Sequence, residues 1–176
     1  MRPVHADQGV LTHALSGSGE AASDMSANGV ARPVREGLFT DTADTADTAS
    51  TVDTGEAGQP RLLGSRCEAC GRHTFPRSDT CPYCAAQGAR PVELSGRGRL
   101  WTWTAVTTPP PGYGGDVPYG FGVVELPEGL RVVTRLTEAD PARLSAGQPM
   151  RLVVTPVLAD EGGPVVTYAF APEDQP

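Results

Sequence analysis

Alternating apolar and polar residues in the second half of the chain predict β-strands. In 98–108, GRLWTWTAVTT, the alternation places Trp101, Trp103 and Ala105 on one face of a strand and Thr102 and Thr104 on the other. Four more strand-like runs follow, each bounded by residues typical of turns. They lie at 119–126, 130–136, 148–160 and 164–172.

A short helix is expected between the third and fourth of these strands. In 140–147, DPARLSAG, Asp140 can cap the helix and Pro141 suits its first position. Five strands with one short helix in that place are typical of a small OB-type barrel. The aromatic residues of the strands are expected in the core or at the barrel rim rather than on a stacking platform. They are Trp101, Trp103, Phe121, Tyr168 and Phe170.

The first third of the chain has a different pattern. Residues 1–60 show almost no apolar periodicity, and 41–54, DTADTADTASTVDT, is of low complexity. Such a composition buries too little surface to offset chain entropy, so we expect a disordered acidic tail, except for a helical turn or two at 34–39. No signal peptide and no apolar run long enough for a membrane helix are found, so a cytoplasmic protein without membrane association is expected.

All four cysteines lie within eighteen residues, as two C-x2-C pairs separated by ten residues: Cys67, Cys70, Cys81 and Cys84. Two such turns converge their sulfurs into the tetrahedron that Zn²⁺ prefers. Gly71 follows the first pair, where a left-handed backbone is needed, while Ala85 takes the same place after the second and is expected to be slightly strained.

Other chemistries for these thiols are weaker. Disulfides are disfavoured by the lack of a secretion signal, and a thioredoxin-like site needs one pair only. Iron, with the same ligands, stays open. A closed four-thiolate site leaves no open coordination position, so its expected role is structural. His73 lies between the pairs and is expected at the surface.

Charge is divided unevenly along the chain. Every basic residue is arginine: residues 1–60 hold three against nine acids, 61–99 seven against three, and 100–176 four against nine. A basic cysteine segment therefore lies between two acidic ones. The proline- and glycine-rich segment 107–120 joins the first two strands, and long loops of this kind are often functional.

These motifs resemble a known family. RCEACGRHTFPRSDTCPYC, SGRGRLWTWT, PPGY, VPYGFGVVEL and LSAGQPMRLVV, in this order, are similar to the acyl-CoA-associated zinc-ribbon/OB-fold proteins, over about 61–172. The resemblance implies an all-β chain with a rubredoxin-like zinc ribbon at 61–90, a five-stranded OB-fold barrel at 91–172 and a short tail at 173–176. It implies a non-catalytic subunit of a hetero-oligomer that acts with a thiolase-fold partner of the thiolase, ketosynthase or aldolase type, in lipid or polyketide metabolism. Family members usually carry helices before the ribbon, and this chain has the 41–54 tract there.

Independent catalysis is disfavoured. The chain has no lysine for Schiff-base chemistry, its cysteines are committed to metal, and His73 is the one histidine outside the tail. A single-stranded nucleic-acid-binding module is the alternative, although the barrel segment is net acidic. An acyl-CoA ligand fits better, since its phosphates need a few arginines. Candidate contacts to CoA or to the partner are Arg97, Arg99, Tyr113 and Tyr119.

Overall fold

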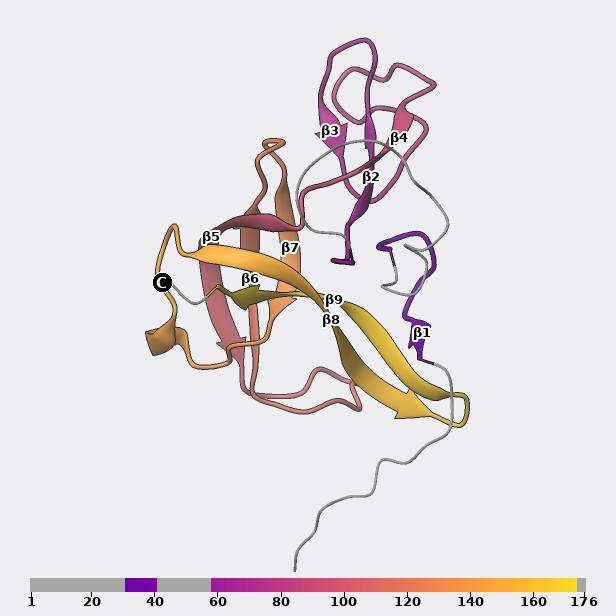
Figure 1. Ribbon diagram of the computed structural model, residues 1–176. Helices are drawn as coiled ribbons and strands as arrows, with labels where there is room; N and C mark the ends of the chain where they lie inside the picture. The colour runs from indigo at the N-terminus through magenta and orange to yellow at the C-terminus, as the bar shows by residue number, and fades with distance from the viewer. Residues whose placement is uncertain (1–30, 41–57, 174–176) are drawn as a thin grey trace, which may run out of the picture.

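The computed structural model describes residues 31–40 and 58–173, which form a small three-stranded sheet and a β-barrel (Figure 1). The small sheet has the order β3-β2-β4 and is antiparallel throughout. It holds the four cysteines in the loops around its strands. The strands are β2 (Leu63–Arg66), β3 (His73–Thr74) and β4 (Arg90–Glu93).

The barrel consists of five strands, as the alternation predicts. Antiparallel pairs join β5 to β6 and β6 to β7, and a parallel pair joins β7 to β9. β8 pairs with both β9 and β5, which closes the barrel. The strands are β5 (Arg97–Val106), β6 (Tyr119–Glu125), β7 (Arg131–Leu136), β8 (Pro149–Asp160) and β9 (Gly163–Pro172).

The predicted short helix is present as one 3-10 turn, η2 (Pro141–Arg143), between β7 and β8. Asp140 is its N-cap: the side chain accepts a hydrogen bond from the N–H of Ala142 at 2.9 Å, and Pro141 follows at the first position. A capping carboxylate satisfies an N–H that has no partner within the turn. The cap and the proline therefore act as the sequence indicates.

One hydrophobic core fills the barrel and continues towards the ribbon, which is the three-stranded sheet with its cysteine loops. Its fully buried members include Leu100 of β5, Val124 of β6 and Phe170 of β9. Leu62 and Leu94, which flank the strands of the small sheet, are buried in this same core. The ribbon is therefore rooted in the barrel's core by its two connecting segments.

Two of the aromatic residues expected in the core or at the barrel rim are exposed. Phe170 is buried and Trp103 packs against the core, but Trp101 and Phe121 are exposed. The β5–β6 register shifts between Leu100 and Thr102, so Trp101 occupies a β-bulge. A bulge adds one residue to a strand and re-aims its side chains. Strict alternation across 98–108 is thus wrong at this point.

Residues 31–40 differ from the prediction that 1–60 lacks structure apart from a helical turn or two at 34–39. β1 (Arg32–Pro33) adds to the edge of β9 in parallel, and Phe39 forms a bridge with Leu62 and is buried in the core. Backbone hydrogen bonds to a sheet edge leave no apolar periodicity in the sequence, which is why the pattern missed the segment. At 34–39 the chain makes non-helical turns instead of the expected helical one. The rest of the expected tail, including 41–54, lies outside the described residues.

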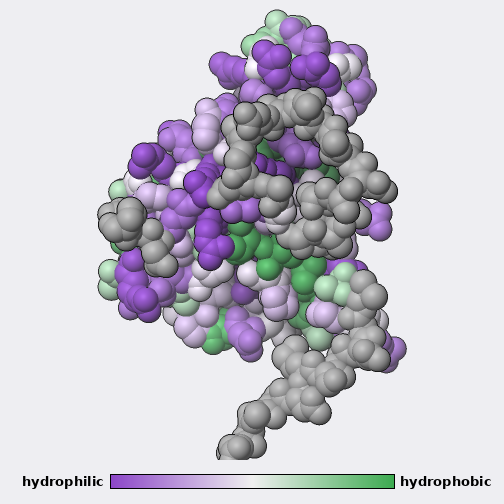
Figure 2. Space-filling model, in the orientation of Figure 1, coloured by the Kyte–Doolittle hydropathy of each residue, from purple (hydrophilic) through white to green (hydrophobic). Residues whose placement is uncertain are grey.

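The ribbon and the barrel differ in the hydropathy of their surfaces. On the face drawn in Figure 2, the ribbon is mostly hydrophilic, whereas hydrophobic residues are visible over the middle of the barrel. No helix within residues 31–40 and 58–173 has the length and apolar character needed to cross a bilayer.

Candidate metal centre, outer sheet face and groove

The two cysteine turns have the same backbone geometry. In the first, the N–H of Gly71 donates to the carbonyl of Cys67 and the N–H of Cys67 to that of Arg72, both at 2.9 Å. In the second, Ala85 and Cys81 repeat these two bonds at 2.9 Å, with the carbonyls of Cys81 and Ala86. Gly71 has φ = 71° and Ala85 has φ = 59°, so both turns need the left-handed region that was expected. Alanine at the second turn carries a steric cost there.

The turns bring the four thiols to one point. The sulfur atoms of Cys67, Cys70, Cys81 and Cys84 all lie within 4.8 Å of one another. Sγ of Cys67 is 3.6 Å from that of Cys84, and Sγ of Cys70 is 3.7 Å from that of Cys81, so no pair is a disulfide. A tetrahedral Zn²⁺ with bonds of about 2.3 Å implies sulfur–sulfur distances of about 3.8 Å. The four cysteines therefore fit a closed zinc site.

The pKa values of two of these thiols diverge because of burial and of their hydrogen bonds to the backbone and to one another. Burial acts to raise the pKa of Cys81, but hydrogen bonds from the backbone at Tyr83 and Cys84 and from neighbouring thiols lower it to about 7. For Cys84, the backbone at Ala86 favours the thiolate, yet the neighbouring thiols and burial outweigh it and raise the pKa to about 12. Like charges this close cannot all form unaided. A divalent cation supplies the charge that lets the thiols ionise together.

His73 takes no part in this cluster. It lies in β3, opposite Arg66 of β2, and is half-buried. Within the described residues, the group able to hold a metal consists of the four cysteines alone. The histidine is therefore a residue of the small sheet.

Arg97 and Arg99 begin β5, and both point outward. Gly98 between them faces inward, since a Cβ there would lie 2.6 Å from Val124 Cγ1. The guanidinium of Arg97 pairs with Glu173 at 3.1 Å, and that of Arg99 donates to the carbonyl of Gly147 at 3.0 Å. Both side chains are thus exposed but held in place.

Tyr113 and Tyr119 lie together at the other end of β5. Their ring centroids are 5.5 Å apart, and the guanidinium of Arg135 lies 4.2 Å from the centroid of Tyr119 and donates to the hydroxyl of Tyr113. Arg135 was not among the sequence candidates. A cation over an aromatic face is attracted by the ring's quadrupole, so this cluster fixes the loop against β6 and β7.

The structure does not bring the four candidates into one small site. β5 has ten residues between its Arg97 end and its Val106 end, a length of about 30 Å at roughly 3.4 Å per residue. Arg97 and Arg99 are at one end of this length, and Tyr113 and Tyr119 at the other. They do share the outward face of the same sheet.

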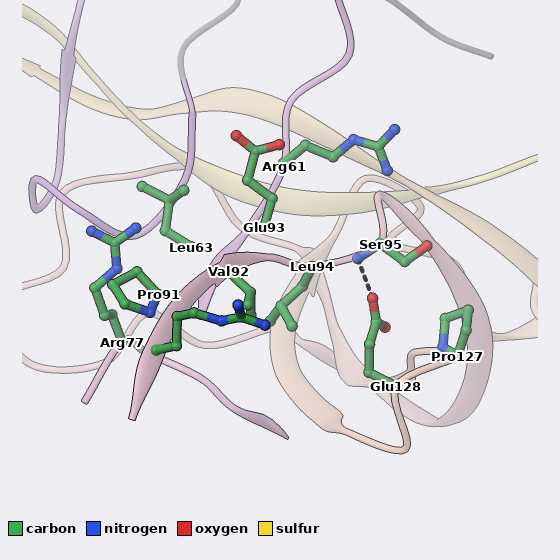
Figure 3. A pocket seen from close by; sticks show the side chains of 11 residues that line it. Arg61, Leu63, Arg77, Pro91, Val92, Glu93, Leu94, Ser95, Pro127 and Glu128 are labelled. Carbon is green, nitrogen blue, oxygen red and sulfur yellow. Dashed lines mark hydrogen bonds between the residues drawn. The ribbon is translucent and has the colours of Figure 1, made fainter. Parts of the chain in front are cut away.

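A groove at the junction of ribbon and barrel was missed by the sequence analysis. Its volume is about 860 Å³, within the range of about 300–1,000 Å³ usual for small-molecule sites. Figure 3 shows Arg77 towards one end and Arg61 towards the other, with Leu63, Val92 and Leu94 between them. The remaining lining residues are Arg90, Pro91, Glu93, Ser95, Pro127 and Glu128.

The groove contains polar groups without partners. Within the described part of the chain, the guanidinium groups of Arg61 and Arg77 form no hydrogen bond or ion pair. Glu128 accepts a hydrogen bond from the N–H of Ser95 at 2.6 Å through one carboxylate oxygen, but its other oxygen is buried without a partner. The one signal for this site in the sequence was the basic character of 61–99. The guanidinium groups of Arg61 and Arg77, with apolar side chains between them, suit a ligand that combines an anionic group with an apolar arm.

The fold and the cysteine site define a class of protein, a zinc ribbon followed by an OB-fold barrel. The family described as ChsH2, rubredoxin-like zinc ribbon domain, matches residues 55–88, and that described as ChsH2, C-terminal OB-fold domain, matches residues 91–155. A DUF35 domain-containing scaffold protein of Pyrococcus furiosus is 34% identical over 64% of this chain and 83% of its own length. The chain therefore belongs to the ChsH2/DUF35 family, as the resemblance in the sequence indicated.

Two further relatives are named for enzymes. Subunit BbsA of the benzoylsuccinyl-CoA thiolase of Thauera aromatica is 34% identical over 63% of this chain and 76% of the subunit. A solved structure described as the Ltp2-ChsH2(DUF35) aldolase matches with a TM-score of 0.51 and 30% identity, over 64% of this chain and 84% of the solved one. The first name gives a protein of this family as a thiolase subunit, and the second joins one to an aldolase.

Proposed function

We propose that this chain is a non-catalytic accessory subunit that binds an acyl-CoA thioester and supports a thiolase-fold partner in carbon–carbon bond formation, aldol cleavage or acyl transfer. The observation that carries the proposal is the pair of relatives named as a thiolase subunit and as part of an aldolase. This chain spans most of the length of each of them.

The chemistry of the described residues supports an accessory role. The sequence contains no lysine, and all four cysteines lie in the metal site. His73 lies in the small sheet and has no carboxylate or hydroxyl partner among its hydrogen bonds within the described residues. Nucleophilic catalysis needs a nucleophile that donates its proton to a base, and within the described residues no hydroxyl donates a hydrogen bond to a histidine or a carboxylate. The partner would supply both groups.

The groove supports the acyl-CoA half of the proposal. CoA combines phosphates with a long, largely apolar arm. Arg61 and Arg77 offer charge-assisted hydrogen bonds to phosphate, and the apolar floor suits the arm. The unpartnered oxygen of Glu128 would accept a hydrogen bond from an amide N–H of that arm. Arg97, Arg99, Tyr113 and Tyr119 remain proposed contacts to the ligand or the partner.

The experiment that tests the accessory role is reconstitution. The tagged full-length chain, loaded with zinc, is co-expressed with each thiolase-fold protein of its source organism. One of these proteins should elute with it as a stable complex and be active on acyl-CoA only, or much more strongly, when the chain is present. Acyl-CoA turnover by the isolated chain, or full activity of every thiolase-fold protein without it, would overturn the proposal.

Binding of CoA tests the groove. Arg77→Ala and Arg61→Ala should each weaken CoA binding by about tenfold in calorimetry, because each removes one hydrogen bond to a charged phosphate. Arg143→Ala is the matched control, since Arg143 is exposed on η2 and pairs with Glu138 at 3.1 Å. Equal CoA affinities for the wild type and all three variants would mean that CoA does not bind in the groove. Tighter binding of single-stranded DNA than of CoA, with a steep salt dependence, would favour the nucleic-acid alternative.

A further inference from the structure

Large apolar side chains are exposed on the outer face of β5, β6 and β7. Trp101 is 51% exposed, Phe121 38% and Val133 55%, and these are three of the six large apolar side chains exposed in the described part of the chain. Burial of such a large apolar side chain in an interface is favourable in free energy, because its surface is removed from water. A cluster of them on one face therefore indicates an interaction surface.

Strand register shows that the three belong to one surface. On β6 and β7 the even-numbered residues are buried, and the odd-numbered ones point outward. Val123 lies directly opposite Val133, and Phe121 lies opposite Arg135 on one side and Thr104 on the other. Trp101 joins them across the bulge, because the guanidinium of Arg131 on β7 lies 4.1 Å from its ring centroid.

The border of this surface is cationic. Arg97, Arg99, Arg131 and Arg135 point outward along it, against two acids: Glu125, which binds Arg131 at 3.2 Å, and Glu173, which binds Arg97 at 3.1 Å. This basic surface belongs to a chain with a formal net charge of −7. The tyrosine pair, Tyr113 and Tyr119, ends the surface beside Arg135. All four candidates from the sequence therefore lie on it.

Composition and rigidity both match the energetically dominant part of a protein interface. Trp, Tyr and Arg are enriched at such positions. Here Arg131 is stacked on Trp101 and bound to Glu125, and Arg135 is fixed by the two tyrosines. Side chains that are already ordered lose little entropy on binding. The surface is thus pre-organised.

The charge also selects the occupant. A second copy of this chain would set arginine against arginine, which opposes self-association. A partner with an apolar patch bordered by carboxylates would complement it. We propose that the outer face of β5–β7 is the surface that docks the thiolase-fold partner, with Trp101, Phe121 and Val133 at its centre. This inference rests on the proposed accessory function.

Two valines provide a matched test. Val133→Glu places a charge at the centre of the surface, whereas Val34→Glu places one at 53% exposed Val34, beside β9. Both are read out on the reconstituted complex by gel filtration and by the dissociation constant. Val133→Glu should weaken the complex at least thirtyfold, Trp101→Ala about as much, and Val34→Glu less than threefold.

Zinc content, thermal melting and CoA binding by the free subunit show that each variant is folded, and all three should stay as in the wild type. Complexes of Val133→Glu and Trp101→Ala as tight as that of Val34→Glu would overturn this inference and leave the accessory function standing. Failure of the wild-type chain to bind any thiolase-fold protein would instead overturn the accessory function, and the docking surface with it.

Discussion

The zinc ribbon and the barrel are stabilised by different interactions. Within the small sheet and its loops the buried side chains are few and short, among them Ser65, Thr74 and Ala89, together with two of the cysteines. The barrel instead buries leucine, valine, methionine and phenylalanine from all five of its strands. A segment with so little apolar burial cannot offset its chain entropy by packing, so the metal must contribute most of its stability.

The two parts are nevertheless coupled. Leu62 enters the ribbon and Leu94 leaves it, and both are fully buried in the barrel core. The connection also positions the groove, since its arginines come from the ribbon side and its Pro127 and Glu128 from the β6–β7 turn. Loss of the metal should therefore disrupt the ribbon and its groove. Loss of apolar packing should instead destabilise the barrel.

Removal of one metal ligand should have the largest effect. Cys81→Ser should release zinc and unfold the ribbon, because zinc binding in such domains contributes about 10–16 kcal/mol at neutral pH. Metal content by elemental mass spectrometry and the amide-exchange protection of 63–93 measure this. Barrel amides should stay protected.

Ala69→Ser is the control, since it adds a hydroxyl at an exposed position within the first cysteine turn. It should keep one zinc per chain. A metal-free Cys81→Ser protein with an intact ribbon would show that the ribbon, like the barrel, is stable without metal. An iron-type absorption spectrum of the wild type would show that the bound metal is iron, and the difference in stabilisation between ribbon and barrel would still hold.

Sequence predicts what depends on short-range spacing. The two C-x2-C turns lie within single loops, so their geometry, including the left-handed Ala85, follows from local sequence. The barrel strands and the Asp140 cap follow from alternation and from local capping rules in the same way.

Features that depend on distant residues could not be predicted. The bulge at Trp101 depends on how β5 pairs with β6, and no local signal marks it. Arg61 and Arg77 share a groove only because two strands of the small sheet fold back on each other. Arg135 joins Tyr113 across twenty-two residues. Pairing between distant strands, rather than composition, sets each of these sites.

Phe39 tests whether packing outside the five strands supports the barrel. It is 8% exposed, contacts the core and lies edge-on to Tyr168, with ring centroids 6.3 Å apart. Phe39→Ala should lower the free energy of unfolding by about 3 kcal/mol, the lower end of the range for buried phenylalanine. Urea unfolding followed by tryptophan fluorescence measures it, with exposed Val34→Ala as the control. A change under about 0.5 kcal/mol would mean that residues 31–40 add nothing to the barrel.

The smallest effect concerns the two cysteine turns, which differ at one residue. Ala85 has φ = 59° where the first turn has Gly71, and an L-residue pays roughly 1–2 kcal/mol there. Glycine removes that strain but gains about 0.5–1 kcal/mol of chain entropy in the unfolded state. Ala85→Gly should therefore stabilise the zinc-bound ribbon by about 0.5 kcal/mol, and Gly71→Ala should destabilise it by about the same amount, for the same reasons with the sign reversed. Competition with a chelator measures both as zinc affinities. Weaker binding by Ala85→Gly than by the wild type would show that the second turn tolerates alanine without strain.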